Sequence, residues 1–126
     1  MSCFKKLELE FPINASPKVL YYRLSTAGGL SEWFADDVNL VGNVFTFFWD
    51  GNEQKAELLS KKDGKFCRFR WLDEDEDTFF EFKISQDELT GDVALVITDC
   101  VDEDEVEDQT ELWEKQVTML KRNLGS

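Results

Sequence analysis

Hydrophobic and polar residues alternate through most of the chain. Between Phe4 and Phe11, Leu7 and Leu9 share one face with Phe11 while charged residues occupy the other, which predicts a half-buried strand that ends at Pro12. The same period of two predicts further strands at residues 38–41, 44–49, 53–60, 65–72, 78–85 and 92–101. Turn-forming residues at 50–52, 63–64 and 90–91 separate several of these strands, which favours hairpins.

Two segments near the N-terminus follow a helical period instead. Ser16-Pro17 is typical of a helix start, and the apolar residues after it predict a helix to about Ala27. Gly28-Gly29 predicts a break in that helix. A second short helix is then expected from Leu30 to Phe34.

The longest predicted helix runs from Asp108 to Leu124. Its apolar residues recur at helical spacing: Trp113, Val117, Leu120 and Leu124. Asp108 and Glu111 have the spacing of a capping box, and Gly125 is placed to end the helix. This is the only predicted element long enough to cover one apolar face of a sheet.

The order of elements predicts an α+β fold in a single domain over residues 1–126. Consecutive strands joined by short turns imply a curved antiparallel sheet of six to seven strands. The long C-terminal helix covers its apolar face, and the two short helices after the first strand close one end. A chain of 126 residues with 42% hydrophobic residues can bury such a core without a metal or disulfide bonds.

The net charge and the cysteine content limit the candidate binding partners and the expected cellular compartment. The net charge of −13 argues against nucleic acid and against anionic membrane surfaces, and leaves a protein with a basic surface as a candidate partner. No apolar run approaches the length of a membrane span, and no signal peptide is apparent. Three cysteines without CxxC spacing predict reduced thiols in a cytoplasmic protein.

The chain contains no histidine, which removes histidine acid/base chemistry, histidine-based triads and most zinc sites. Asp73, Asp75 and Asp77 imitate the start of a calcium loop, but Thr78 and Ile84 occupy positions that need glycine and an acid. The acidic run 102–105 departs from that pattern as well. We therefore expect no metal and no cofactor.

Catalytic candidates are few. Asp36, Asp37 and Asp99 could supply a general base beside a pocket, but no nucleophile motif accompanies them. Cys67 and Cys100 are expected to be packing residues, because nothing near them in the sequence lowers a thiol pKa. No residue is assigned a catalytic role.

Three segments carry a family resemblance: Phe11-Pro-Ile-Asn-Ala-Ser-Pro17, Leu30-Ser-Glu-Trp-Phe34 and Leu112-Trp-Glu-Lys-Gln-Val-Thr-Met-Leu120. In this order they resemble the START-like (SRPBCC, helix-grip) superfamily, and within it the branch of homologues of the heat-shock-protein-90 ATPase activator. Val117 stands where that branch commonly has leucine. The resemblance covers essentially the whole chain.

The resemblance implies a curved sheet that grips the C-terminal helix, often around an apolar cavity. Members bind lipids, sterols or other hydrophobic molecules, some are enzymes, and the activator domain binds a chaperone. The residues expected to line such a cavity are Trp33, Phe34, Phe47, Trp49, Phe69, Trp71, Phe80, Phe82, Trp113 and Val117. The alternative is that these side chains simply fill the core.

Arg68 and Arg70 alternate with apolar residues and are expected to face outward and pair with acids on neighbouring strands. If they faced the cavity, they would indicate a ligand that carries a carboxylate. The favoured function is non-enzymatic binding of a small hydrophobic ligand between the sheet and the C-terminal helix. A co-chaperone-like protein-interaction module and a cyclase or hydrolase remain as alternatives.

Overall fold

Seven antiparallel strands form one sheet, in the order β1-β7-β6-β5-β4-β3-β2. The computed structural model describes residues 5–125, so the predictions for Cys3 and Phe4 lie outside the described residues. The elements in chain order are β1 (Lys5–Ile13), α1 (Pro17–Ser25), α2 (Ala27–Leu30), β2 (Asp37–Val41), β3 (Val44–Trp49), β4 (Asn52–Lys62), β5 (Phe66–Trp71), β6 (Phe80–Gln86), β7 (Val93–Val101), a 3-10 helix η1 (Glu103–Glu105) and α3 (Val106–Leu124).

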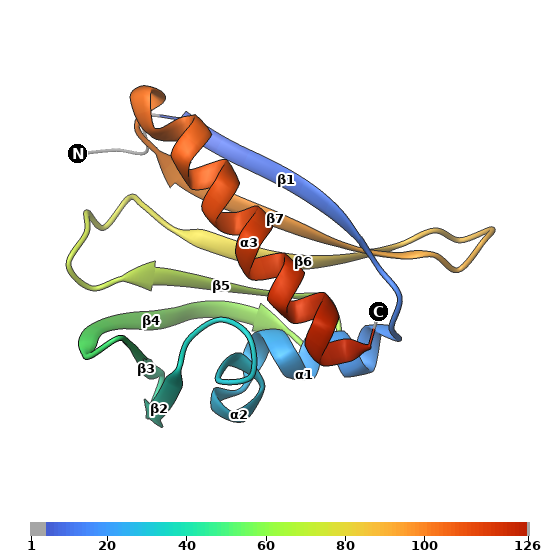
Figure 1. Ribbon diagram of the computed structural model, residues 1–126, viewed down its shortest axis with the longest axis horizontal. Helices are drawn as coiled ribbons and strands as arrows, with labels where there is room; N and C mark the ends of the chain where they lie inside the picture. The colour runs from blue at the N-terminus through green and yellow to red at the C-terminus, as the bar shows by residue number, and fades with distance from the viewer. Residues whose placement is uncertain (1–4, 126) are drawn as a thin grey trace.

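The predicted α+β architecture is confirmed. The sheet curves, α3 lies diagonally across one of its faces, and α1 and α2 sit together at one end (Figure 1). Each neighbouring pair of strands in the chain from β2 to β7 is joined as a hairpin, and the return of β7 to β1 completes the sheet. Asp50 and Gly51 have positive φ in the turn between β3 and β4, and Gly64 has φ +74° in the turn between β4 and β5.

The first strand continues past the proline that was expected to end it. β1 reaches Ile13, and Pro12 lies opposite Ala94 of β7. Pro12 is tolerated because β1 is an edge strand, where the missing backbone N–H removes no hydrogen bond from an outer neighbour. The alternation predicted for this strand is present, since Leu7, Leu9 and Phe11 are partly buried and the residues between them are exposed.

The short helices differ from the prediction. α1 begins as expected, with the Ser16 hydroxyl accepting a hydrogen bond from Val19 N at 3.2 Å. Gly28 and Gly29 do not break a helix but lie inside α2, and residues 31–34 form turns. Thr26 starts α2 because its hydroxyl accepts a hydrogen bond from Gly29 N at 2.9 Å.

Gly29 is required at its position by a close backbone contact. A Cβ atom there would lie 2.1 Å from Tyr22 O and 2.7 Å from the Cα of Arg23. The same atom at Gly28 would meet only the Tyr22 hydroxyl, at 3.0 Å. The glycine pair therefore lets α2 pack directly against the end of α1.

The final helix begins earlier than predicted. α3 starts at Val106, directly after η1, and no side chain caps its N-terminus, so the predicted capping box at Asp108 and Glu111 is wrong. The acidic residues before Asp108 have little apolar character, which is why the helical pattern is not visible there. The predicted end is confirmed, because Gly125 adopts a left-handed conformation with φ +73°.

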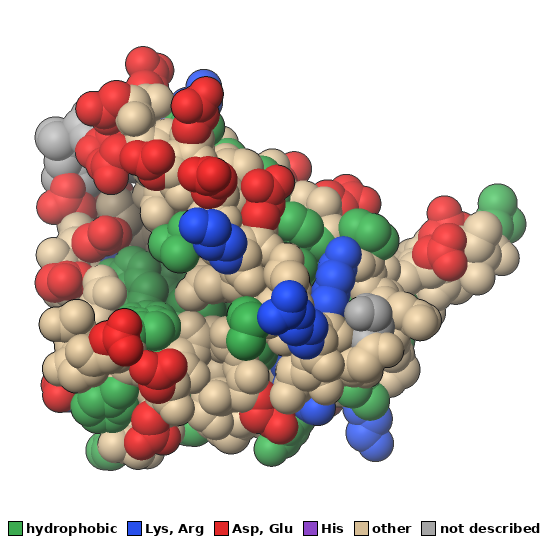
Figure 2. All heavy atoms as spheres, viewed as in Figure 1, with side chains coloured by type: hydrophobic (Ala, Val, Ile, Leu, Met, Phe, Trp, Pro, Cys, Tyr) green, Lys and Arg blue, Asp and Glu red, His purple; other side chains and the backbone are tan. Residues whose placement is uncertain are grey.

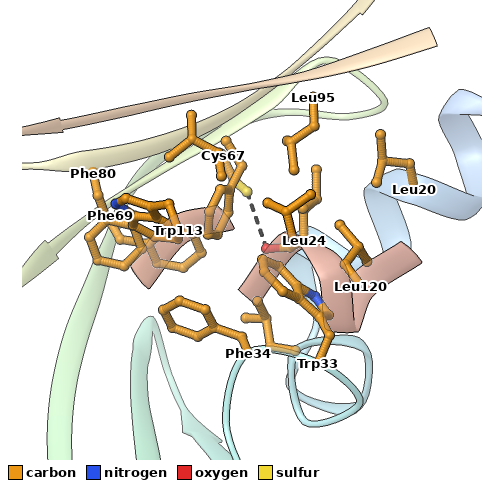
Figure 3. Packing of buried hydrophobic residues seen from close by; sticks show 14 of the residues in the cluster. Leu20, Leu24, Trp33, Phe34, Cys67, Phe69, Phe80, Leu95, Trp113 and Leu120 are labelled. Carbon is orange, nitrogen blue, oxygen red and sulfur yellow. Dashed lines mark hydrogen bonds between the residues drawn. The ribbon is translucent and has the colours of Figure 1, made fainter. Parts of the chain in front are cut away.

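The core lies between the concave face of the sheet and the helices. Leu20 and Leu24 of α1 and Leu120 of α3 are fully buried there. Figure 3 shows these aliphatic side chains next to Leu95 and Cys67 of the sheet, with the aromatic residues Phe69, Phe80 and Trp113 to one side. The Cys67 thiol donates a hydrogen bond to Leu24 O at 3.3 Å, which ties the sheet to α1.

Candidate functional site: a cleft between the sheet and α3

A cleft of about 840 Å³ opens between the sheet and residues 109–119 of α3. Its walls come from the segment after α2, from the ends of β3, β4 and β5, from β7 and from α3. Figure 2 shows apolar side chains recessed beside α3, with acidic side chains around them. The lining residues are Ser31, Glu32, Trp33, Phe34, Ala35, Asp36, Trp49, Gln54, Trp71, Glu74, Asp99, Gln109, Leu112, Trp113, Gln116 and Met119.

The residues predicted to line a cavity separate into two groups. Trp33, Phe34, Trp49, Trp71 and Trp113 line the cleft. The other five are fully buried behind it and do not reach its surface: Phe47, Phe69, Phe80, Phe82 and Val117. Whether the first group binds a ligand stays a prediction, while the second group occupies the core.

Phe34 occupies the space beneath Trp113. The two rings are stacked with centroids 5.9 Å apart and an interplanar angle of 17°. On its other sides Phe34 meets the edge of Phe47 at 5.1 Å and lies parallel to Trp71 at 6.4 Å. The inner part of the space between sheet and helix is therefore filled by an aromatic side chain, and only the outer part is open.

Hydrogen bonds from aromatic and amide side chains hold the segment that carries Phe34. Trp49 Nε1 donates to Phe34 O at 2.7 Å, and Gln116 Nε2 of α3 donates to the same carbonyl at 3.3 Å. Trp33 Nε1 donates to Arg23 O at 2.8 Å. The segment is thus fastened to β3, to α3 and to α1, which fixes one wall of the cleft.

Trp71 differs from the other tryptophans. The indole N–H groups of Trp33, Trp49 and Trp113 donate to acceptors within the protein. Within residues 5–125, no hydrogen bond is formed by Trp71 Nε1, and no buried side-chain nitrogen or oxygen lacks a partner. The Trp71 side chain is half-buried at the end of β5, so its N–H group is available to solvent or to a ligand in the cleft.

Asp99 is the buried carboxyl group of the cleft. Its side chain is only 8% exposed, and its Oδ2 atom accepts hydrogen bonds from Trp113 Nε1 at 2.9 Å and from Gln109 Nε2 at 3.3 Å. Burial raises the pKa of Asp99 above the usual range, and these hydrogen bonds oppose that rise only in part. Within the described residues, Asp99 has no Lys or Arg partner.

Glu74 lies at the mouth of the cleft, in the acidic loop after β5. Loss of solvent raises the pKa of the Glu74 carboxyl, and repulsion from Asp99, Asp73, Asp75 and Asp102 raises it further. The interaction with Asp102 shows that the loop after β5 and the loop before α3, which are far apart in sequence, lie near each other. Together they make this end of the molecule strongly acidic.

The arginines of β5 lie outside the cleft, as the sequence predicted. Arg68 Nη2 pairs with Glu81 Oε1 of β6 at 2.9 Å, and Arg70 Nη2 pairs with Glu57 Oε1 of β4 at 3.6 Å. Neither arginine lines the cleft. The alternative that these arginines receive a carboxylate-bearing ligand is therefore wrong.

The acidic loop before α3 brings Asp102, Asp104 and Glu105 together. One carboxylate oxygen from each lies within 4.8 Å of the others, and all three residues are exposed. A hydrogen bond with Asp102 and the repulsion of that residue raise the pKa of Glu105.

Cys67 and Cys100 do not line the cleft. Burial raises the pKa of the Cys67 thiol far above its ordinary value, so this residue is a packing group, as predicted, and not a nucleophile. Cys100 on β7 is disulfide-bonded, so the prediction of reduced thiols throughout is wrong for that residue. With three cysteines, the chain cannot pair all of them in disulfide bonds, but it can form one such bond.

The polar part of the cleft supplies binding groups more readily than catalytic ones. Asp99 is the one buried acid among the lining residues, and its contacts are the N–H donors of Trp113 and Gln109. No serine, threonine or cysteine hydroxyl or thiol within residues 5–125 donates a hydrogen bond to Asp99. The hydrogen bonds recorded for Asp99 therefore hold its carboxyl group in place and do not pair it with a side-chain nucleophile.

Several lining residues are absent from the predicted set. Leu112 and Met119 of α3 are about half exposed and line the cleft from the helix side. Gln109 and Gln116 lie on the same side and donate hydrogen bonds into it. Their spacing of three, four and seven residues along α3 marks one helical stripe, which is the sequence signal that could have found them.

Comparison with known proteins identifies the superfamily to which this fold belongs. A START-like superfamily domain matches residues 1–126. A comparison with curated proteins finds no match. No helix within the described part of the chain is long and apolar enough to cross a membrane.

Three solved structures illustrate the likeness. The Aha1 dimer from Colwellia psychrerythraea has 20% identity and a TM-score of 0.79, with 94% of each chain covered. CalU16 from Micromonospora echinospora has 14% identity and a TM-score of 0.72, over 92% of this chain and 71% of that one. DynU16, a protein of the dynemicin biosynthetic locus, has 15% identity and a TM-score of 0.80, over 96% of this chain and 47% of that one. At these identities the likeness concerns the fold, and together with the whole-chain match it establishes that the protein belongs to the START-like superfamily.

Proposed function

We propose that the protein binds a small hydrophobic ligand in the cleft between the sheet and α3. The observation that carries the proposal is the cleft itself, whose volume of about 840 Å³ lies within the range of small-molecule sites. Trp49 and Trp71 expose part of their rings on the sheet side, and Leu112 and Met119 face them from the helix side. Covering these apolar surfaces with a ligand removes them from water, which favours binding.

The same cleft offers a few polar groups that would orient a ligand. The Trp71 N–H group has no partner within residues 5–125 and can donate a hydrogen bond. Gln54 and Gln109 bring amide groups to the lining. Apolar walls with a small number of polar groups are typical of sites that bind small molecules without reacting with them.

Thermal unfolding with a panel of neutral, lipid-like compounds tests this proposal. A ligand present at a hundred times its Kd should stabilise the protein by about 2.7 kcal/mol, which raises Tm by several degrees. The variant Leu112→Trp should lose most of this gain, because the larger side chain enters the cleft. The matched variant Leu89→Trp should keep it, because Leu89 is 96% exposed in the turn between β6 and β7. No change in Tm with any compound, or an equal gain in Leu112→Trp, would count against the proposal.

A second candidate function is docking of a protein with a basic surface. It is supported by the two acidic segments, at residues 73–77 and 102–105, since Asp102 of the second repels Glu74 of the first beside the cleft. Such a complex should form quickly at low salt and weaken as salt is added. A pull-down in 50 mM and 500 mM salt is the direct test, and a complex of unchanged strength would exclude this mode of binding.

A further inference from the structure

Every charged side chain that lines the cleft is acidic. The four residues are Glu32, Asp36, Glu74 and Asp99, and no Lys or Arg lines the cleft. Glu32 is already neutralised, since Arg23 Nε lies 3.1 Å from its carboxylate. The other three acids have no ion-pair partner within residues 5–125.

Different contacts position the residues that carry these three carboxyl groups. Asp36 Oδ2 accepts a hydrogen bond from Asp50 N at 3.0 Å, so its carboxylate is fixed at the edge of the wall formed by the segment after α2. Glu74 N donates to Trp71 O at 3.1 Å, which places Glu74 one turn beyond the tryptophan at the end of β5. Asp99 lies deeper and is bonded to Trp113 and Gln109. The negative charge is thus distributed along the cleft from its mouth to its back.

The aromatic rings form a wall and not a slot. Phe34 and Trp49 have centroids 5.5 Å apart, Trp49 and Trp71 are 6.1 Å apart, and Phe34 and Trp71 are 6.4 Å apart. Rings at these separations touch one another, so no group fits between them. An apolar ligand body would lie flat on the wall, and a cation attached to it would reach the acids at the rim or lie over the exposed face of a tryptophan.

We propose that the ligand of this cleft is a cation with an apolar body, such as a hydrophobic amine or ammonium compound. This inference rests on the proposed function and specifies the chemical class of ligand for the same site. The acids that lack ion-pair partners would receive the positive charge, and the tryptophan wall would receive the apolar part. A ligand with a carboxylate or phosphate would meet only like charges in the cleft, and it would have to approach a protein whose net charge is −13.

The surroundings of Asp99 support this assignment independently of the rim. Asp99 is only 8% exposed and has no cationic partner within residues 5–125, so its carboxyl group is unfavourable when it is ionised, as its raised pKa indicates. A cation bound near it would offset that cost. The loop acids raise the pKa of Glu74 in the same way, and a bound cation would relieve their mutual repulsion.

Three naphthalene probes of nearly equal shape separate charge from hydrophobicity: 2-(2-naphthyl)ethylamine, 2-naphthaleneethanol and 2-naphthylacetate. Isothermal titration calorimetry at 150 mM salt gives the Kd of each. The amine should bind roughly tenfold more tightly than the alcohol, and the carboxylate should bind most weakly. If the alcohol binds as tightly as the amine, this inference fails while the proposed function stands. If no probe binds, the proposed function fails and the inference fails with it.

Two matched variants locate the effect. Glu74→Gln removes a charge that lines the cleft, whereas Glu76→Gln removes the same charge from the same loop without touching the cleft. The ratio of alcohol Kd to amine Kd should fall by about twofold to fivefold in Glu74→Gln and stay unchanged in Glu76→Gln. Asp99→Asn, which keeps an oxygen for Trp113 Nε1, should also lower the ratio. Because the alcohol reports any change in shape, an equal fall in Glu74→Gln and Glu76→Gln would overturn the inference in favour of non-specific attraction by the net charge.

Discussion

The space between the sheet and α3 contains two regions that differ in how completely they are filled. In the first, the closed region, Leu20 and Leu24 of α1 meet Leu120 of α3 and Cys67 of β5, and all four are fully buried. In the second, the open region, Trp49 and Trp71 face Leu112 and Met119 across the cleft. One curved sheet and one helix form both, so sheet curvature alone does not decide whether a cavity exists.

The difference arises from what covers each region. A whole helix, α1, packs into the closed region and supplies two buried leucines. The open region is bordered by the short segment 31–36, which places the Phe34 ring beneath Trp113. A helix fills the concave face along its length, while a turn fills it at one point. The open end is therefore also the end where polar side chains such as Asp99 remain within reach of solvent.

Thiol labelling should give the largest contrast between the two regions. Cys67 in the closed region should react with iodoacetamide at least about a thousandfold more slowly than a cysteine placed in the open region by Leu112→Cys. Reaction of Cys67 requires the core to open, which costs several kcal/mol, whereas residue 112 lies on the surface. Peptide mapping by mass spectrometry distinguishes the sites, and comparable rates would show that the closed region is not closed.

Truncating one leucine in each region gives the next largest effect. Leu24→Ala should lower the free energy of unfolding by about 2–5 kcal/mol, because it leaves a cavity in a filled core. Leu112→Ala should change it by no more than about 0.5 kcal/mol, since Leu112 is 48% exposed and alanine suits a helix. Urea unfolding measures the free energy of unfolding of both variants. Losses of similar size would contradict the distinction between a closed and an open region.

Substitutions at Gly28 and Gly29 test whether α2 packs directly against α1, next to the segment that forms one wall of the cleft. Gly29→Ala should destabilise the protein by about 1–3 kcal/mol, because its Cβ would collide with the backbone of α1. Gly28→Ala should cost less, because only the exposed Tyr22 side chain must move. Urea unfolding measures both. A smaller loss in Gly29→Ala than in Gly28→Ala would mean that α2 does not pack as described.

The pH dependence of Tm should arise in the open region, through Asp99. We expect it to be smaller than the three effects described above. The folded pKa of Asp99 is raised above its unfolded value, so its proton stabilises the folded state. This contribution is present below the unfolded pKa and is lost as pH rises through the folded pKa. Lowering the pH through the folded pKa toward the ordinary pKa of an aspartate should therefore raise Tm, and Asp99→Asn should reduce that rise. A variant that follows the wild-type curve throughout would show that Asp99 does not contribute.

Most of the architecture could be predicted because it depends on period and spacing. The alternation in the strands, the Asp63-Gly64 turn and the Trp113–Leu120 stripe each identify an element from local residues. The errors lie where a contact distant in sequence decides the structure. Pro12 is tolerated because of its place at the sheet edge, and Gly29 belongs to a helix because of its approach to Tyr22.

The site was only partly predictable for the same reason. All ten predicted residues either line the cleft or lie in the core behind it, but alternation cannot tell these two positions apart. Phe47 and Trp49 share a face of β3, and only Trp49 reaches the cleft. That distinction depends on the position of Phe34, which lies in a segment predicted as a short helix but found as turns.

Binding in the cleft, and not in the closed region, is tested most directly by a ¹⁵N–¹H correlation spectrum recorded while the naphthalene probes are added. The indole N–H signals of Trp49 and Trp71 should shift as a probe binds in the cleft, while the backbone amide signals of Leu24 and Cys67 should stay in place. Shifts centred on Leu24 and Cys67, or no shift of Trp49 and Trp71 with any probe near saturation, would contradict binding in the cleft.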